Sequence, residues 1–257
     1  MALVLVFHGG GSSGIAAARL TQFTRIAERE RFAVVYPDAW QRNWNDGRAA
    51  AKLASQRAKV NDVAFVSALL DAVGRETQLD PARVFATGIS NGAIFAHYLA
   101  GNLSERIVAI APVVGGMAEP YAAAFAPSQP VSVLAIQGTD DPLVPYRGGG
   151  VVHGRHGRVL STDGAISMWV RHDACASGPR ATLLADGDPG DGCRFESKVW
   201  SDCARGTEVE LLRGVGMGHT WPGGRQYLPQ GVIGRACRDF DAGERIWQFF
   251  QAHARLR

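Results

Sequence analysis

The feature that most constrains the fold is an alternation of short apolar runs with longer amphipathic segments. The runs are rich in Val, Ile and Ala, which is typical of strands buried on both faces. They cover Ala2–Phe7, Phe32–Tyr36, Arg83–Thr87, Ile107–Val114 and Val131–Ile136. Helices are expected over Ile15–Arg29, Asn61–Val73, Asn91–Leu103 and Thr162–Ala174. This alternation predicts an α/β protein with a mostly parallel sheet covered by helices on both faces.

The last third of the chain adds shorter signals. Ser197–Ser201 and Glu208–Leu212 are expected to be strands, and a final helix should begin near Asp241 with a capping-box-like start. Pro37–Lys59 and Gly138–Leu160 are expected to be long loops, which are often functional in compact domains. With 257 residues, 46% of them hydrophobic, we expect residues 1–257 to form a single domain.

Charge and hydropathy exclude two classes of partner. The chain has 27 Lys and Arg against 24 Asp and Glu, a formal net charge of +3, and no basic block. Nucleic acid is therefore not expected as a partner. No apolar run approaches the roughly 18–20 residues that a membrane helix needs, so no membrane partner is expected either.

One serine lies in a pattern that favours nucleophilic catalysis. Gly88-Ile89-Ser90-Asn91-Gly92 fits GxSxG, follows the predicted strand Arg83–Thr87 and begins the predicted helix. A nucleophile elbow requires this strand–turn–helix context, in which flanking glycines allow the sharp turn. The alternative is a Gly/Ser turn before a helix. The context favours Ser90 as a nucleophile.

Two later strands end at residues that could activate this serine. Asp140 and Asp141 follow the strand Val131–Ile136, and His219 follows Glu208–Leu212. The order serine, acid, histidine, with each residue after a strand, is the order of an α/β-hydrolase triad. Spacing does not separate Asp140 from Asp141, because either could instead cap the turn.

The remaining histidines have less favourable positions. His97 lies within the helix after the elbow and is expected to pack there, and His8 is expected to brace the glycine loop that follows it. His153 and His156 lie in a Gly/Arg-rich loop and are expected to be solvated.

A glycine-rich loop follows the first strand directly. His8-Gly9-Gly10-Gly11-Ser12-Ser13-Gly14 would let a backbone N–H approach a substrate oxygen closely, while Asn91 after the nucleophile supplies a second N–H. The nucleotide-binding patterns GxGxxG and GxxxxGK[ST] both fail at this loop. The loop predicts an oxyanion hole, and we expect no cofactor.

The cysteines indicate an oxidising compartment. Four cysteines, none in a CxxC pattern, lie in loop-rich segments of the last third. Metal binding is therefore not expected, whereas disulfides are. Three connectivities are possible. The alternative is buried free thiols in a cytosolic enzyme.

The run Ala2–Phe7 lacks the features of a signal peptide, and the chain is expected to begin inside the fold.

Five segments occur together in one order: Phe7–Gly11, Asn43–Arg48, Gly88–Ala93, Gly138–Tyr146 and Gly218–Gly223. In this combination the chain resembles the α/β-hydrolase family of secreted feruloyl esterases and polyhydroxybutyrate depolymerases. The resemblance implies an α/β-hydrolase catalytic domain without metal or cofactor. It assigns the site as follows: Ser90 as nucleophile, Asp141 as acid, His219 as base, and Gly10 and Asn91 as oxyanion donors.

The resemblance also implies a disulfide between Cys175 and Cys203, with a second bridge between Cys193 and Cys237 as a further guess. It suggests a secreted or periplasmic protein. Family members usually carry a signal peptide and two further N-terminal strands, which we expect to be missing from this chain. Their absence should expose an edge of the sheet.

The implied function is a serine carboxylesterase that cleaves aromatic (feruloyl-type) or short acyl esters, borne by a small molecule or a polymer. One alternative is a depolymerase of polyhydroxybutyrate or its oligomers, and another is an inactive polymer- or carbohydrate-binding relative. Trp44 and Trp221 are candidate walls of a substrate slot, unless both pack the loops instead. Tyr146 and Asp46 are candidate hydrogen-bonding partners of substrate.

Overall fold

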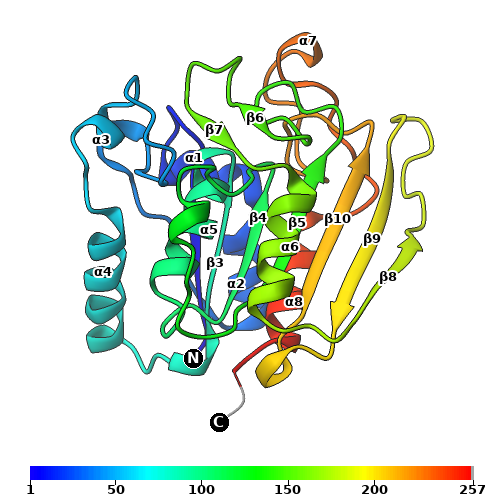
Figure 1. Ribbon diagram of the computed structural model, residues 1–257. Helices are drawn as coiled ribbons and strands as arrows, with labels where there is room; N and C mark the ends of the chain where they lie inside the picture. Colours follow the sequence, from blue (N-terminus) through cyan, green and yellow to red (C-terminus); the bar gives the residue numbers. More distant parts are fainter. Residues whose placement is uncertain (256–257) are drawn as a thin grey trace.

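The computed structural model describes residues 1–255, whose strands form an eight-stranded sheet in the order β2-β1-β3-β4-β5-β10-β9-β8 (Figure 1). Adjacent strands from β2 to β10 are parallel, and β9 and β8 add to the sheet in antiparallel pairs. The bounds in chain order are β1 Leu3–Phe7, β2 Ala33–Val35, β3 Val84–Ile89, β4 Ala109–Val113, β5 Ser132–Gly138, β8 Ser177–Leu183, β9 Arg194–Ser201 and β10 Val209–Val215. A separate small hairpin pairs β6 (Gly149–Gly150) with β7 (Arg158–Val159).

Helices cover both faces of the sheet, as the sequence predicts (Figure 1). The α-helices are α1 Gly14–Thr21, α2 Phe23–Glu30, α3 Ala54–Arg57, α4 Asp62–Glu76, α5 Asn91–Asn102, α6 Thr162–His172, α7 Gln230–Ile233 and α8 Ala242–Ala252. The 3-10 helices are η1 Trp40–Arg42, η2 Pro81–Arg83, η3 Ala122–Ala124 and η4 Ala204–Gly206. Within residues 1–255, none of the helices combines the length and apolar character that crossing a membrane requires.

Strand β1 shows how the sheet separates two cores. Leu3, Leu5 and Phe7 join the core with α4, α5 and α6, while Val4 and Val6 join the core with α1, α2 and α8. Alternate residues of a strand point to opposite faces, so a strand covered on both sides must be apolar throughout. The continuous apolar run at the start of the chain therefore becomes a central strand.

Several predicted elements differ from the structure. The expected helix Ile15–Arg29 is two helices, because Gln22 adopts a left-handed backbone (φ 56°) that ends α1 before α2 begins. The expected loops are not wholly irregular: Pro37–Lys59 contains η1 and α3, and Gly138–Leu160 contains the β6–β7 hairpin. Strand β8 is not predicted from the sequence, because all seven of its residues are exposed and no buried apolar pattern marks it.

The expected capping of the last helix is confirmed. The side chain of Asp241 caps α8 by accepting the Glu244 N–H at 3.1 Å. The three-residue strand β2 lies at one end of the sheet order and pairs with β1 alone among the described strands. Among the described strands, β2 is thus a short edge strand.

His97 on α5 is a buried histidine of the core. Its Nδ1 accepts the indole N–H of Trp169 at 3.0 Å, which confirms the expected packing role. Burial lowers the pKa of His97 from its usual 6.5 to about 4. The folded protein therefore binds this proton less readily than the unfolded chain, and stability is lost as pH falls below about 6.5 toward 4.

We predict that His97→Gln flattens the pH dependence of stability over this range. Glutamine keeps an acceptor for Trp169 but does not titrate, so the wild type should lose about 3 kcal/mol more than the variant between pH 7 and pH 4. Urea unfolding at both pH values measures the difference. An unchanged pH dependence in the variant would contradict the assignment.

Candidate active site

Ser90 occupies the sharp turn between β3 and α5. Its backbone lies at φ 59° and ψ −119°, a conformation that non-glycine residues rarely adopt and that neighbouring packing must enforce. A Cβ on Gly92 would lie 2.3 Å from the Phe7 carbonyl oxygen, and one on Gly88 would lie 2.7 Å from the same atom. Both glycines are therefore required by the close approach of β1. The predicted strand–turn–helix arrangement is present.

His219 and Asp141 are joined in a buried pair. His219 Nδ1 lies 2.7 Å from Asp141 Oδ2, and the two residues are only 3% and 6% exposed. The other carboxylate oxygen accepts the N–H groups of Leu143 and Val144, each at 2.8 Å. Because Nδ1 donates to the carboxylate, Nε2 retains the lone pair that a general base needs.

Asp140 does not reach His219. It is exposed, and its Oδ1 accepts the hydroxyl of Thr139 at 2.9 Å. The structure thus separates the two candidate acids that spacing left open and brings Asp141 to the histidine.

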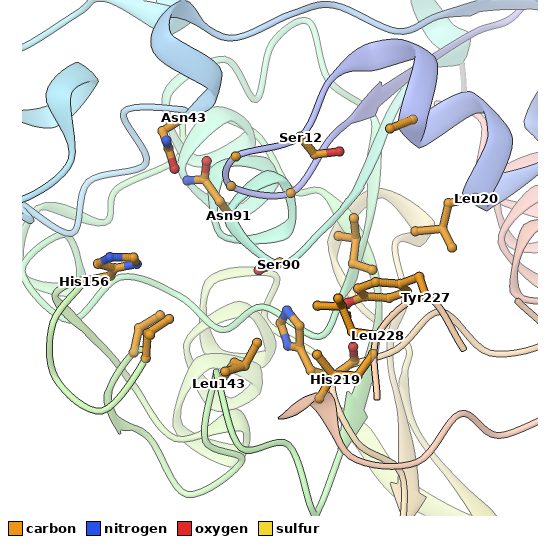
Figure 2. A pocket seen from close by; sticks show the side chains of 18 of the residues that line it. Ser12, Leu20, Asn43, Ser90, Asn91, Leu143, His156, His219, Tyr227 and Leu228 are labelled. Carbon is orange, nitrogen blue, oxygen red and sulfur yellow. Dashed lines mark hydrogen bonds between the residues drawn. The ribbon is translucent and has the colours of Figure 1, made fainter. Parts of the chain in front are cut away.

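Ser90 and His219 line one cavity of about 490 Å3. Figure 2 shows both side chains pointing into it, with Leu20, Tyr227 and Leu228 on one side of Ser90 and His156 on the other. Its walls are largely aliphatic, formed by Ala16, Leu20, Leu53, Ile89, Leu143, Val151, Val152, Leu228 and Ile233. An ester placed at Ser90 would therefore contact apolar groups in both directions.

The predicted oxyanion loop borders the same cavity. Gly10 and Asn91 both line it, and within residues 1–255 their backbone N–H groups have no hydrogen-bond acceptor. A Cβ on Gly10 would lie 2.8 Å from Asn43 Oδ1, so this position also favours glycine. Two unpaired N–H groups beside a serine can stabilise a developing oxyanion.

His8 braces the loop, as expected. Its Nε2 accepts the N–H of Ala39 at 3.0 Å, so Nδ1 carries the proton and donates to the Gly9 carbonyl at 2.7 Å. Burial lowers the pKa of His8, which favours this neutral form. Both ring nitrogens are used structurally.

The four residues predicted to contact substrate do not line the cavity. Trp44 is fully buried and stacks on Phe95 with ring centroids 4.9 Å apart, and Trp221 is 2% exposed within the core that contains α8. The two tryptophans thus pack the loops, which was the alternative interpretation. Asp46 is fully buried in an ion pair with Arg48.

Tyr146, the fourth residue, makes its contacts outside the cavity lining. Its hydroxyl donates to Asp163 at 3.3 Å, and the Arg213 guanidinium lies 5.8 Å from its ring centroid. Tyr146 lies close to Asp141 in the chain, but this closeness does not bring its side chain into the cavity lining.

Several residues that sequence reasoning missed do line the cavity: Asn43, Arg48, His156, Tyr227 and Leu228. His156 was expected to be solvated but is half-buried in the cavity wall. The Tyr227 hydroxyl donates to the His219 carbonyl at 2.8 Å. These residues come from irregular loops, where no apolar period marks which side chains turn inward.

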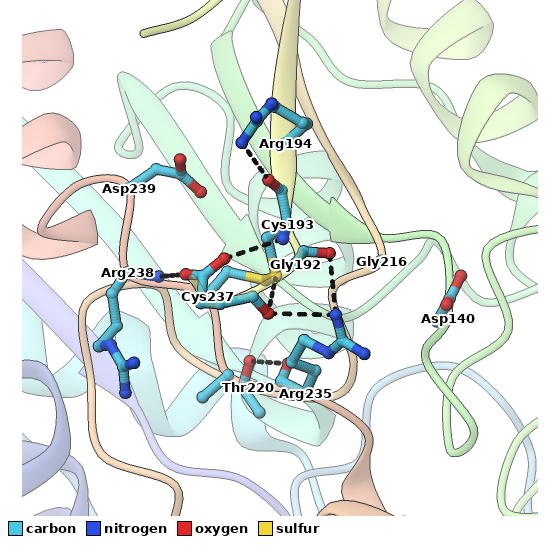
Figure 3. Close-up of a disulfide and its surroundings, with 12 residues drawn as sticks. Asp140, Gly192, Cys193, Arg194, Gly216, Thr220, Arg235, Cys237, Arg238 and Asp239 are labelled. Atoms are coloured by element: carbon cyan, nitrogen blue, oxygen red, sulfur yellow. Dashed lines mark hydrogen bonds between the residues drawn. A yellow bond between two sulfur atoms is a disulfide. The ribbon is translucent and has the colours of Figure 1, made fainter. Parts of the chain in front are cut away.

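A disulfide braces the segment after His219 (Figure 3). Cys193 and Cys237 form a disulfide bond. Arg235, which lies between His219 and Cys237 in the chain, donates from Nη1 to the Asp191 and Gly192 carbonyls. The Arg235 carbonyl in turn accepts the Gly218 N–H at 2.9 Å. Cross-links between this loop and the segment just before β9 thus hold the backbone beside the histidine.

The other disulfide joins Cys175 to Cys203, near the end of α6 and the end of β9. The two pairings are therefore those implied by the resemblance and by the further guess, and no free cysteine remains among the described residues.

A mostly parallel sheet with a serine elbow after β3, and with an aspartate and a histidine after β5 and β10, defines the α/β-hydrolase fold. Residues 1–142 match the family model described as Esterase PHB depolymerase. The chain belongs to that family.

Two relatives extend the match by sequence. The chain is 26% identical to putative esterase NocK of Nocardia uniformis subsp. tsuyamanensis over 255 residues, which cover 96% of this chain and 73% of that protein. It is 26% identical to feruloyl esterase B of Piromyces equi over 163 residues, which cover 62% of this chain and 29% of that protein. The chain thus matches under a third of the length of the feruloyl esterase. Ester hydrolysis is the activity class that the family and these relatives support.

Solved structures show the same fold. An acetyl xylan esterase from Aspergillus awamori superposes with a TM-score of 0.65 at 13% identity, covering 97% of this chain and 88% of that one. Esterase PE8 superposes with a TM-score of 0.55 at 19% identity, covering 98% and 92%.

We predict that Trp44→Ala and Leu228→Ala affect different properties. Trp44 is fully buried, so its truncation should lower the free energy of unfolding by about 3–5 kcal/mol. Leu228 lines the cavity and is 46% exposed, so its truncation should change stability by less than about 1 kcal/mol. Urea denaturation measures both. A Trp44→Ala protein as stable as the wild type would refute the packing role.

Proposed function

We propose that residues 1–257 form a single catalytic domain of a serine carboxylesterase that cleaves feruloyl-type aromatic or short acyl esters through an acyl-enzyme. The observation that carries the proposal is the buried hydrogen bond between His219 and Asp141 beside the cavity that also holds Ser90. A nucleophile, a base and an orienting acid in this arrangement form the minimum set for acyl transfer.

In the first step, His219 Nε2 takes the proton of the Ser90 hydroxyl as Oγ bonds to the ester carbonyl carbon. The carbonyl oxygen becomes an oxyanion, which accepts hydrogen bonds from the N–H groups of Gly10 and Asn91. The tetrahedral intermediate then collapses, the bond to the alcohol oxygen breaks, and His219 transfers its proton to that oxygen. The products are a free alcohol and an ester on Ser90.

In the second step, His219 takes a proton from water, and the resulting hydroxide attacks the acyl carbon. The bond between that carbon and Ser90 Oγ breaks, and His219 returns the proton to Oγ. Asp141 remains ionised and stabilises the imidazolium in both steps. The chemistry uses only side chains, backbone N–H groups and water.

The cavity lining bears on the acyl group. Its walls are aliphatic, and Tyr227 is the one Phe, Tyr or Trp side chain among the described lining residues. Since Trp44 and Trp221 do not line the cavity, Tyr227 is the one phenyl, phenol or indole ring of the described lining that could stack on a cinnamoyl ring. The lining therefore favours short aliphatic acyl groups within the proposed range.

A polyester or its oligomers is a second candidate substrate. Leu228 at the cavity is 46% exposed, and Val232 on the adjacent helix α7 is 50% exposed. Exposed apolar groups near a cavity mouth favour a substrate with apolar segments beyond the cleaved bond. The match to the Esterase PHB depolymerase family model is consistent with this candidate.

We further propose an oxidising location, either extracellular or periplasmic. Both disulfides join segments far apart in the sequence, with separations of 28 and 44 residues. Disulfides persist in oxidising compartments and are rare in the cytosol.

We predict that hydrolysis depends on Ser90 and Asp141 and favours short acyl groups. Ser90→Ala and Asp141→Asn should each lower kcat by about 10⁴-fold, because one removes the nucleophile and the other removes the orienting charge. Asp140→Asn is the matched control and should stay within about twofold of the wild type. Rates on p-nitrophenyl butyrate, methyl ferulate and a 3-hydroxybutyrate oligomer measure both the dependence and the preference.

Turnover that survives in Ser90→Ala would refute the mechanism. A faster rate on methyl ferulate than on the butyrate ester would refute the aliphatic preference, and a faster rate on the oligomer would favour the depolymerase. If all three esters are inert, the inactive binding relative becomes the better account.

A further inference from the structure

Asp46 is a buried carboxylate that the proposed reaction does not use. It is fully buried, does not line the cavity, and lies in the loop between η1 and α3. Arg48 Nη2 lies 2.7 Å from Oδ2, and Arg48 Nε contacts both oxygens at 2.9 and 3.0 Å. Gln56 Nε2 donates to Oδ1 at 2.7 Å. Such a group is stable only because its oxygens are paired.

One further donor to Asp46 comes from the active site. Asn91 Nδ2 donates to Asp46 Oδ2 at 2.6 Å, a short bond to a charged acceptor. The same amide nitrogen also donates to the Trp44 carbonyl at 3.2 Å, and Asn91 Oδ1 accepts the Trp44 N–H at 2.8 Å. The side chain of Asn91 is therefore held at three contacts by residues 44 and 46.

In the proposed mechanism, Asn91 is one of the two residues whose backbone N–H groups stabilise the oxyanion, and it lines the cavity. It is the first residue of α5 and follows Ser90 directly. A fixed side-chain amide fixes its Cβ and Cα, and with them the direction of the N–H. Small errors in the position of an oxyanion donor are costly, because the stabilisation depends on preorganised geometry.

We propose that Asp46 is a positioning residue of the oxyanion hole, acting through the side chain of Asn91. The inference rests on the proposed function and adds to it the group that orients one of its two N–H donors.

Arg48 makes this role compatible with the reaction. An unpaired carboxylate near a developing oxyanion would oppose its negative charge. The bidentate contact with Arg48 balances the charge of Asp46 while leaving Oδ2 available to Asn91. Arg48 Nη1 also donates to the His156 carbonyl at 2.8 Å, so the pair is linked to a second segment of the cavity wall.

The test is Asp46→Asn, in which an NH2 group replaces one of the acceptor oxygens. We expect kcat for p-nitrophenyl butyrate to fall by about 10- to 100-fold while KM changes by less than about threefold, because the oxyanion forms only in the transition state. Affinity for a boronic acid inhibitor, whose serine adduct is tetrahedral, should fall in parallel with kcat. If Asp46 serves stability alone, neither kcat nor the affinity for the boronic acid should change.

Glu210→Gln is the matched control. Glu210 on β10 is 2% exposed and pairs with Arg245 and Ser197, remote from the cavity lining. Its replacement should lower the melting temperature to a similar extent but leave kcat within about twofold of the wild type. Equal kcat values in Asp46→Asn and Glu210→Gln would overturn the proposal.

The variant Asn91→Ala is a second test of the proposal, and it leaves the Asp46–Arg48 pair intact. It removes the side-chain amide but keeps the backbone N–H, so kcat should fall about as far as in Asp46→Asn. In the double variant the two losses should not multiply, because both break the same link. Fully multiplicative losses would overturn the proposal even if Asp46→Asn alone is unstable.

Failure of this inference is distinguishable from failure of the proposed function. If Ser90→Ala retains turnover, the serine mechanism fails, and with it the oxyanion hole. If turnover requires Ser90 while Asp46→Asn behaves like Glu210→Gln, the positioning role alone is refuted.

Discussion

The close approach of β1 to the turn between β3 and α5 is the constraint on which the site depends. Gly88 and Gly92 leave no room for a Cβ against the Phe7 carbonyl, and the chain between them passes through the strained conformation of Ser90. The same contact places the start of α5 beside the glycine loop that continues β1. One packing requirement therefore brings together the serine and both of the proposed N–H donors.

Buried polar contacts fix the positions of the loops that carry the acid and the histidine. The acid and the histidine arrive on loops after β5 and β10, and the pair is stable because Asp141 accepts bonds from His219 and from two backbone N–H groups. The loop between η1 and α3 is likewise organised by the Asp46 carboxylate. Unsatisfied buried polar groups are costly, so these networks hold long loops that lack apolar periodicity.

The central strands, Ser90 and His219 could be predicted from sequence because each has a local signal. Spacing left Asp140 and Asp141 as alternatives for the acid, and the resemblance to the family favoured Asp141. Buried strands are continuously apolar, and the elbow carries its own glycines. The break at Gln22 and the exposed strand β8 have no such signal. The role of Trp44 could not be predicted from the sequence either, because an indole is equally suited to a substrate slot and to a loop core. Its stacking on Phe95 in the structure decides for the core. The prediction that Asp46 contacts substrate does not fit its burial, because its carboxylate is paired within the protein.

The central claim is that Ser90 carries the acyl group during turnover. Rapid mixing with p-nitrophenyl butyrate, acid quenching and peptide mapping by mass spectrometry test it most directly. The account predicts one butyryl group on the peptide that contains Ser90, and none when His219 is replaced by alanine. A butyryl group on a different residue during turnover, or undiminished turnover by Ser90→Ala, would contradict it.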